Sequence, residues 1–84
     1  MKHHTASRFW DAYAILPATL RRQADTNFRR LKVNPFHPSL HFKQVGKYWS
    51  VRVGRDYRAL AVRKGDDLVW FWIGHHADYD RLVG

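Results

Sequence analysis

The stretch YWSVRVGRDYRALAVRKGDDLVWFWIG, residues 48–74, decides the fold that this sequence predicts. Apolar and polar side chains alternate over residues 48–53, as they do in a strand with one buried face. Gly54-Arg55-Asp56 and Lys64-Gly65-Asp66 are turn sequences, so the strands on either side of each turn are expected to pair as antiparallel hairpins. The last strand, residues 67–73, is apolar on both faces, which predicts a central strand covered on both sides.

The residues upstream of this stretch predict one more strand and two helices. A short strand is expected over 40–45, after an elbow at 34–39 whose two prolines fix the direction of the chain. Apolar residues recur at three- and four-residue spacing on both sides of Pro17, which indicates two amphipathic helices within about 6–33. The second of these is expected over about 17–33, antiparallel to the first.

Helices followed by strands are typical of the α+β class. We therefore expect a single domain over residues 1–84, in which a helical hairpin packs on one face of a four-stranded antiparallel sheet at about 40–74. A short helical turn is expected at the C-terminal end. His3-His4, near the start, is expected to belong to a disordered tail.

Charge is the first functional indication. The net charge is +8, and a field of that sign attracts nucleic acid or an acidic protein partner. The absence of cysteine excludes a disulfide scaffold and a thiolate metal site. No segment approaches the roughly 18 consecutive apolar residues of a membrane span. A soluble, cytoplasmic protein without membrane association is expected.

Three segments carry a resemblance to one family. Leu31-Lys32-Val33-Asn34-Pro35 resembles a helix end of that family, residues 48–58 resemble its central "vRvG-x-yR" hairpin, and residues 73–79 (IGHHADY) resemble the "iG-x-H-x-x-Y" ending of its nuclease branch. With the predicted order of helices and strands, these segments make nearly the whole chain similar to the RelE/ParE toxin superfamily, and to its RelE-like members in particular.

The resemblance implies a toxin that inhibits translation by cleaving messenger RNA, often on the ribosome, and that a cognate acidic antitoxin holds silent. The ParE branch shares the fold but poisons DNA gyrase without being an enzyme. A catalytically inactive relative that binds RNA or an antitoxin is a further alternative. Because one fold serves all three outcomes, the site has to separate them.

Arg58 and Arg52 are predicted to hold the phosphate of an RNA substrate. Metal-free cleavage directs a ribose 2′-hydroxyl at the neighbouring phosphate, which requires cations and groups that move protons. The guanidinium matches phosphate oxygens, and the two arginines lie on neighbouring predicted strands, with Arg52 on the face opposite Val51. The alternative is that each is a solvated arginine paired with a carboxylate such as Asp56 or Asp67.

His76 and Tyr79 complete the predicted catalytic group. His76 matches the histidine of the family ending, and imidazole titrates near neutral pH, so it suits proton transfer. The alternative for His76 is a surface or helix-capping role. Tyr79 is predicted to stack on a base or to assist proton transfer. Its alternative is to dock a last helical turn onto the sheet, together with Leu82 and Val83.

Five further residues are predicted to contact RNA: Lys43, Lys47, Arg55, His41 and His75. Lys43 and His41 are expected on the first strand, on the face that lines the RNA path, whereas His75 is expected to be an accessory phosphate contact. The alternative for each is an ordinary solvated charge.

Neither a metal nor a cofactor is expected. His75 and His76 on an extended backbone would point to opposite faces, and no cysteine completes a ligand set. The chain departs from the family in two respects. Its potent ribosome-dependent members carry an arginine or a lysine cluster where this chain has His75-His76-Ala77, and glutamate, the base in some relatives, is absent from the sequence. A catalytic protein with this sequence must therefore use a histidine for proton transfer.

Overall fold

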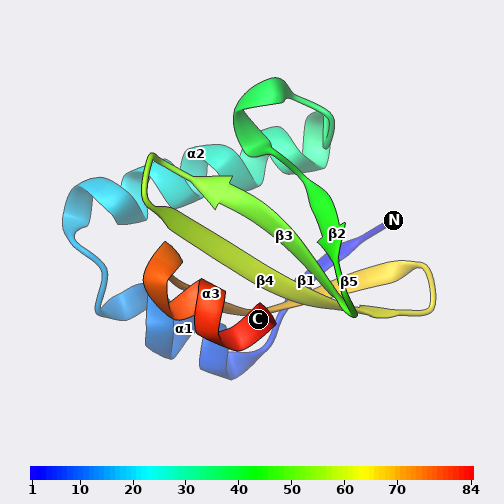
Figure 1. Cartoon of the computed structure of the whole chain (residues 1–84). Helices are drawn as coiled ribbons and strands as arrows, with labels where there is room; N and C mark the ends of the chain where they lie inside the picture. The colour runs from blue at the N-terminus through cyan, green and yellow to red at the C-terminus, as the bar shows by residue number, and fades with distance from the viewer.

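The computed structural model describes all residues from Met1 to Gly84, and it arranges three α-helices around a five-stranded sheet (Figure 1). In chain order the elements are β1 (His3–Thr5), α1 (Ser7–Ala14), α2 (Ala18–Val33), the short 3-10 helix η1 (Pro38–Leu40), β2 (Lys43–Val45), β3 (Tyr48–Val53), β4 (Tyr57–Lys64), β5 (Asp67–His75) and α3 (His76–Val83). The strand order across the sheet is β1-β5-β4-β3-β2, and every pair is antiparallel except β1 with β5.

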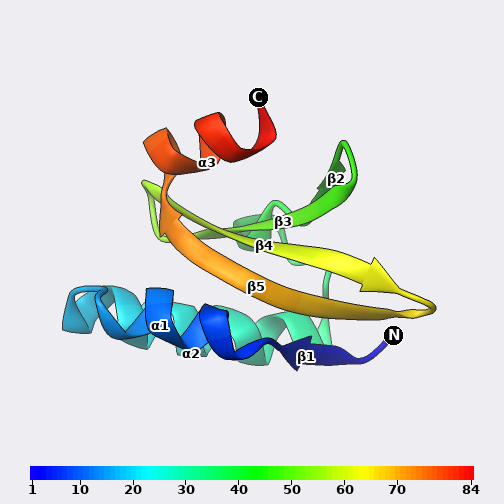
Figure 2. The same ribbon diagram turned by 90° about the horizontal axis from the view of Figure 1, so that it is seen from below.

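Two helices cover one face of the sheet, and the third lies on the other face (Figure 2). The core between α1, α2 and the sheet is formed by the strand residues that alternate inward, among them Val51, Val53, Ala59 and Trp70, and by helix residues such as Leu31. The α+β class and the antiparallel hairpins of β2 to β5 are thus confirmed. None of the helices has the length and hydrophobicity needed to cross a bilayer.

The expectation of a disordered tail at His3-His4 is wrong, because these residues form β1, which adds a fifth strand parallel to β5. The ring of His3 stacks on Trp70 at 6.1 Å between centroids and accepts a hydrogen bond of 3.1 Å from the Trp70 indole N–H. The Asp67 carboxylate accepts one from the Lys2 backbone N–H and a second from the His4 ring, and both lower the pKa of Asp67. Contacts at the far end of the sequence therefore order the start of the chain.

The first predicted strand, over 40–45, is shorter than expected. Leu40 is fully buried at the end of η1, and the chain then reverses at His41, whose φ of +45° lies in the left-handed region. Regular pairing begins only at Lys43, which lies opposite Ser50. His41 therefore belongs to a link before β2 and not to a strand, which corrects its expected placement.

The apolar strand β5 lies between β1 and β4, but its two faces are covered unequally. Leu68, Trp70 and Ile73 are buried against the helices, whereas Val69 and Phe71 on the other side remain partly exposed. Coverage on both sides was thus only partly realised, because α3 is too short to span the second face. It covers the end of the sheet where Leu60 is fully buried on the side opposite the main core.

The His3 contacts predict how the stability of the fold depends on pH. Burial, followed by the positive charge of nearby groups including Lys32, lowers the pKa of His3. Between that lowered pKa and the ordinary value of about 6.5, the unfolded chain binds more protons than the folded chain, so the unfolding free energy rises with pH in this window. A doubly protonated imidazole also cannot accept the Trp70 indole hydrogen bond.

We expect His3→Leu to reduce the slope of melting temperature against pH below the ordinary histidine pKa of about 6.5, relative to the wild type. Thermal unfolding followed by circular dichroism at half-unit pH steps measures this slope. His37→Leu, which removes a histidine outside the sheet, is the control. Equal slopes for the wild type and His3→Leu would show that the His3 contact is not formed in solution.

Candidate functional site

Two arginines face each other on β3 and β4, close to the turn that joins these strands. Arg52 on β3 pairs in register with Arg58 on β4, so both side chains leave the same face. The core fixes that face, because Val51, Val53 and Ala59 are buried on the helix side and side chains alternate along a strand. The proximity of the two guanidinium-bearing residues, which the sequence predicted, follows directly from this register.

Neither arginine is neutralised by a carboxylate. Arg52 donates from Nε to the Gly54 carbonyl at 3.0 Å, and Arg58 donates from Nη1 to the Tyr57 carbonyl at 3.4 Å. The four ion pairs of the chain involve other residues, and Asp67 is occupied by His4. Directly opposed like charges destabilise a pair of strands. This position is therefore electrostatically suited to an anion.

His76 lies at the same end of the sheet as these arginines. The register partner of Arg58 is Gly74, two residues before His76, and the His76 backbone N–H donates to the Asp56 carbonyl at 2.8 Å. The side chain of His76 is 49% exposed, and its Nδ1 lies 3.8 Å from the Asp80 carboxylate one helical turn later. Its Nε2 makes no hydrogen bond within the chain and faces no competing partner.

His75 caps the helix that His76 begins. Its Nδ1 accepts a hydrogen bond of 3.1 Å from the Ala77 backbone N–H, which satisfies a free donor of the first turn of α3. The rings of His75 and His76 lie 4.5 Å apart. The expectation that they point to opposite faces is therefore wrong, because the backbone is extended only as far as His75 and turns helical at His76. In the whole chain no three His, Asp or Cys side chains gather as a metal site would need.

Tyr79 is a buried residue of α3, with 8% of its surface exposed. The Arg58 guanidinium lies over its ring, 5.9 Å from the centroid. This placement matches the docking role that sequence analysis left open, and it makes Tyr79 a support for Arg58. Stacking of a base on the same ring face would compete with the guanidinium.

The five predicted RNA contacts are not all brought together. Arg55 lies exposed in the β3–β4 turn, and His41 lies 3.5 Å from Nη1 of Arg52, so both are near the arginine pair. Lys43 shares the face of Arg52, since it lies opposite Ser50. Lys47 lies in the turn at the other end of the sheet, with its ammonium 5.4 Å from the centre of the Tyr48 ring. It stands apart from the site.

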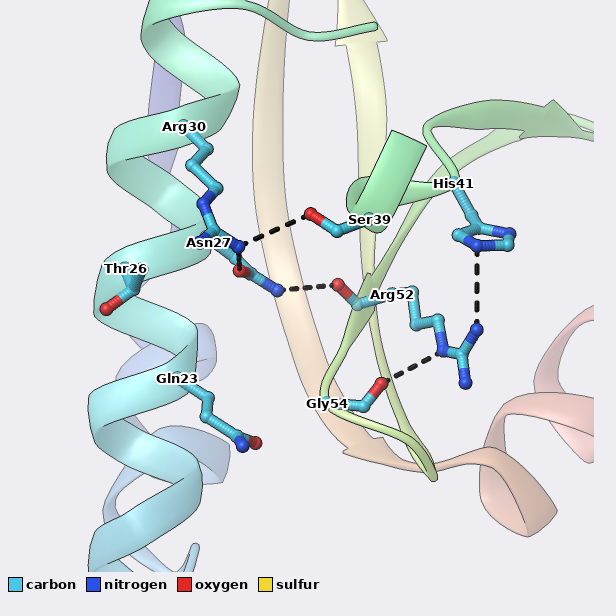
Figure 3. A pocket seen from close by; sticks show the side chains of 8 residues that line it. All are labelled: Gln23, Thr26, Asn27, Arg30, Ser39, His41, Arg52 and Gly54. Atoms are coloured by element: carbon cyan, nitrogen blue, oxygen red, sulfur yellow. Dashed lines mark hydrogen bonds between the residues drawn. The ribbon is translucent and has the colours of Figure 1, made fainter. Parts of the chain in front are cut away.

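A polar cavity of about 450 Å³ opens beside Arg52, where β2 diverges from β3 and α2 passes close by (Figure 3). We call it the α2–β3 notch; its lining residues are Gln23, Thr26, Asn27, Arg30, Ser39, His41, Arg52 and Gly54. Sequence analysis singled out no polar residue of this helix and missed the cavity. The available signal was the spacing of Gln23, Asn27 and Arg30, which places three polar side chains in one helical stripe.

Comparison with known proteins was made on both sequence and structure. A family profile described as the ParE-like toxin domain matches residues 18–81. No curated protein sequence matches the chain.

Solved structures share the fold over almost their entire length. A chain of the RelB-RelE antitoxin-toxin complex from Methanococcus jannaschii superposes with a TM-score of 0.74 at 18% identity, covering 96% of this chain and 99% of that one. The YoeB/ParE toxin from Agrobacterium tumefaciens gives 0.67 at 21% identity, with 90% and 99% covered. The isolated RelE toxin from E. coli gives 0.63 at 10% identity, with 99% and 98% covered.

Tyr79 is buried whereas Arg58 is only partly buried, so we expect their substitutions to change stability by different amounts. Tyr79→Ala should lower the unfolding free energy by about 3 kcal/mol, since it empties a buried aromatic site. Arg58→Gln should change it by less than about 1 kcal/mol, because relief of repulsion from Arg52 offsets the lost contact with the Tyr79 ring. Urea unfolding measures both values. A loss for Arg58→Gln as large as that for Tyr79→Ala would make Arg58 a structural residue.

Proposed function

Because this chain belongs to the ParE-like toxin domain family, we propose that it is the toxin of a toxin–antitoxin pair and acts in the cytoplasm as a metal-independent endoribonuclease that cleaves mRNA and inhibits translation. The observation that carries this proposal is the arginine pair Arg52 and Arg58, unneutralised by any carboxylate and located at the same end of the sheet as His76. The two arginines suit the phosphate of a phosphodiester, and the histidine suits the transfer of the proton that its cleavage requires.

The chemistry requires no group outside the chain. The 2′-hydroxyl of the RNA attacks the adjacent phosphorus, the bond from phosphorus to the 5′-oxygen breaks, and a 2′,3′-cyclic phosphate and a 5′-hydroxyl result. Nε2 of His76 takes the proton of the 2′-hydroxyl, and the resulting imidazolium returns it to the leaving 5′-oxygen. The Asp80 carboxylate, 3.8 Å from Nδ1, stabilises the imidazolium between these transfers.

The two arginines stabilise the transition state. Attack adds negative charge to the phosphate oxygens, and guanidinium groups already in place on rigid strands need little rearrangement to meet it. The ring of Tyr79 packs against the Arg58 guanidinium and so positions it. Lys43, Arg55, His41 and His75 contribute positive charge or hydrogen-bond donors along the path of the RNA, whereas Lys47 is too far along the sheet to reach the scissile phosphate.

The proposed protein partner is an acidic antitoxin. The chain has a net charge of +8, and much of that charge lies on α2, which carries Arg21, Arg22, Arg29, Arg30 and Lys32. The structural relative from Methanococcus jannaschii was solved as an antitoxin-toxin complex, which supports the same kind of partner here. Electrostatic complementarity of this kind favours fast association.

A second candidate function is non-enzymatic inhibition of DNA gyrase. The description of the matching family, a ParE-like toxin domain, favours it. In that case Arg58 and His76 have no catalytic task, and their substitution should leave toxicity in place. A third outcome is a relative that has lost catalysis and only binds RNA or its antitoxin.

The decisive experiment expresses the wild type, His76→Ala and Arg58→Ala in growing cells and maps mRNA 5′ ends. We expect new ends within translated codons for the wild type, and a loss of about 100-fold or more for each variant, since removal of a proton-transfer group or a transition-state donor costs that much. Purified protein with a short RNA should give a 2′,3′-cyclic phosphate by mass spectrometry, in the presence of a chelator as well as in its absence.

His4→Ala and Arg63→Ala are the matched controls, since both are exposed residues remote from the arginine pair. Both should retain wild-type cleavage. DNA damage with intact mRNA would contradict the endoribonuclease and support inhibition of DNA gyrase. Absence of any effect on growth would indicate the inactive relative.

A further inference from the structure

The α2–β3 notch adds to the arginine pair a positive charge, that of Arg30, which the cleavage step does not use. Its eight lining residues include no carboxylate and no apolar side chain, whereas they do include Arg30, Arg52 and His41. Neither arginine forms an ion pair anywhere in the chain. Two guanidinium groups that line one cavity without a counterion favour an anionic ligand.

Both sides of the notch hold their cations in place (Figure 3). On the helix side, Nη1 of Arg30 donates to the Ser39 hydroxyl at 3.3 Å and to Oδ1 of Asn27 at 3.4 Å. Asn27 in turn donates from Nδ2 to the Arg52 carbonyl at 2.9 Å, which joins α2 to the free edge of β3. The cations are therefore mounted on two packed elements and not on a mobile loop.

His41 lies in the notch in an unusual backbone conformation. It is the only non-glycine residue of the chain with a positive φ, and that conformation brings its ring to 3.5 Å from Nη1 of Arg52. A left-handed non-glycine residue carries a conformational cost and is frequently found at binding sites. This observation is independent of charge and points to the same cavity.

The lining also specifies the class of anion. A volume of about 450 Å³ accommodates more than a single ion. The cavity has no Phe, Tyr, Trp or aliphatic residue, and its one aromatic ring, that of His41, lies 3.5 Å from Nη1 of Arg52, so the lining favours the backbone of a nucleic acid over its bases. Guanidinium, amide and hydroxyl donors match the phosphate oxygens and ribose of a nucleic-acid backbone, and such contacts position a strand without reading its sequence.

We propose that the α2–β3 notch is a second phosphate subsite, which holds a backbone phosphate of the RNA flanking the one that is cleaved. Arg30 grips this phosphate from α2, and Arg52 stands between the notch and Arg58 and so connects the two subsites. This inference rests on the proposed function, because it assumes that the ligand is RNA. If the subsite exists, a substrate must extend by at least one further nucleotide on one side of the cleaved bond.

A scan of uncharged linkages tests the subsite. The protein carries His76→Ala to prevent cleavage, and the probe is a short single-stranded RNA in which one phosphate at a time is replaced by a methylphosphonate. The affinity of each probe is measured by fluorescence anisotropy for this parent, for Arg30→Gln and for Arg22→Gln. Arg22 is an exposed arginine of the same helix outside the notch, so it provides the matched control.

We expect Arg30→Gln to raise the Kd about tenfold and to lower the slope of log Kd against log salt by about one. A methylphosphonate at one position should weaken binding to the parent and to Arg22→Gln, whereas the affinity of Arg30→Gln should be the same with and without it. Arg30→Lys should recover part of the affinity lost in Arg30→Gln. Thermal melts confirm that all variants are folded.

Equal behaviour of Arg30→Gln and Arg22→Gln at every position would overturn the subsite. A polyglutamate peptide whose affinity depends on Arg30 while that of RNA does not would overturn it too, since the notch would then belong to a protein partner. Cleavage by the wild type is scored separately. If the wild type does not cut RNA but the scan finds the position, the catalytic proposal fails and the subsite stands.

Discussion

The register of one hairpin determines most of what this molecule can do. Val51, Val53 and Ala59 must be buried, and because strand side chains alternate, Arg52 and Arg58 are forced onto the opposite face directly across from each other. The apolar core thus compensates for a repulsive contact that the two strands would not form by themselves. The fold holds Arg52 and Arg58 together, and no carboxylate of the chain offsets their repulsion. An anionic ligand bound between them would offset it.

Much of this arrangement follows from local patterns in the sequence. The alternation around Arg52, the turn at Gly54 and the family-like ending at His76 each predicted an element that the structure contains, and together they predicted that Arg58 and Arg52 lie side by side. Burial of Tyr79 on the sheet was one of two roles left open for it. Patterns with a period of two residues or of one helical turn are what a single sequence reports well.

The features that sequence analysis missed depend on contacts between distant segments. A strand of three residues, His3–Thr5, has no periodicity to detect, and its partner lies more than sixty positions away. The backbone turns between His75 and His76 because α3 begins at His76. The two rings therefore lie side by side, whereas an extended backbone would have placed them on opposite faces. The spacing of Gln23, Asn27 and Arg30 indicates a polar stripe on α2, but the α2–β3 notch also needs β2 to leave β3 beside that stripe, and this contact between distant segments is not written in the helical pattern.

The fold alone leaves the activity open, since relatives at 10–21% identity share it over nearly their full length. The groups that the proposal uses are the charged residues that this chain places on the shared fold. Positive groups occupy the face and the edge of the sheet near the β3–β4 turn, and His76, whose Nε2 makes no hydrogen bond within the chain, begins the last helix.

The parallel pairing of β1 with β5 also bears on the synthesis of the protein. The first strand emerges from the ribosome long before its only partner, so the sheet cannot close until residues near Trp70 have been translated. Arg58 then still lacks Tyr79, which supports it, because α3 follows β5 in the chain. The nascent chain therefore carries both arginines before the site is finished, until α3 has been translated.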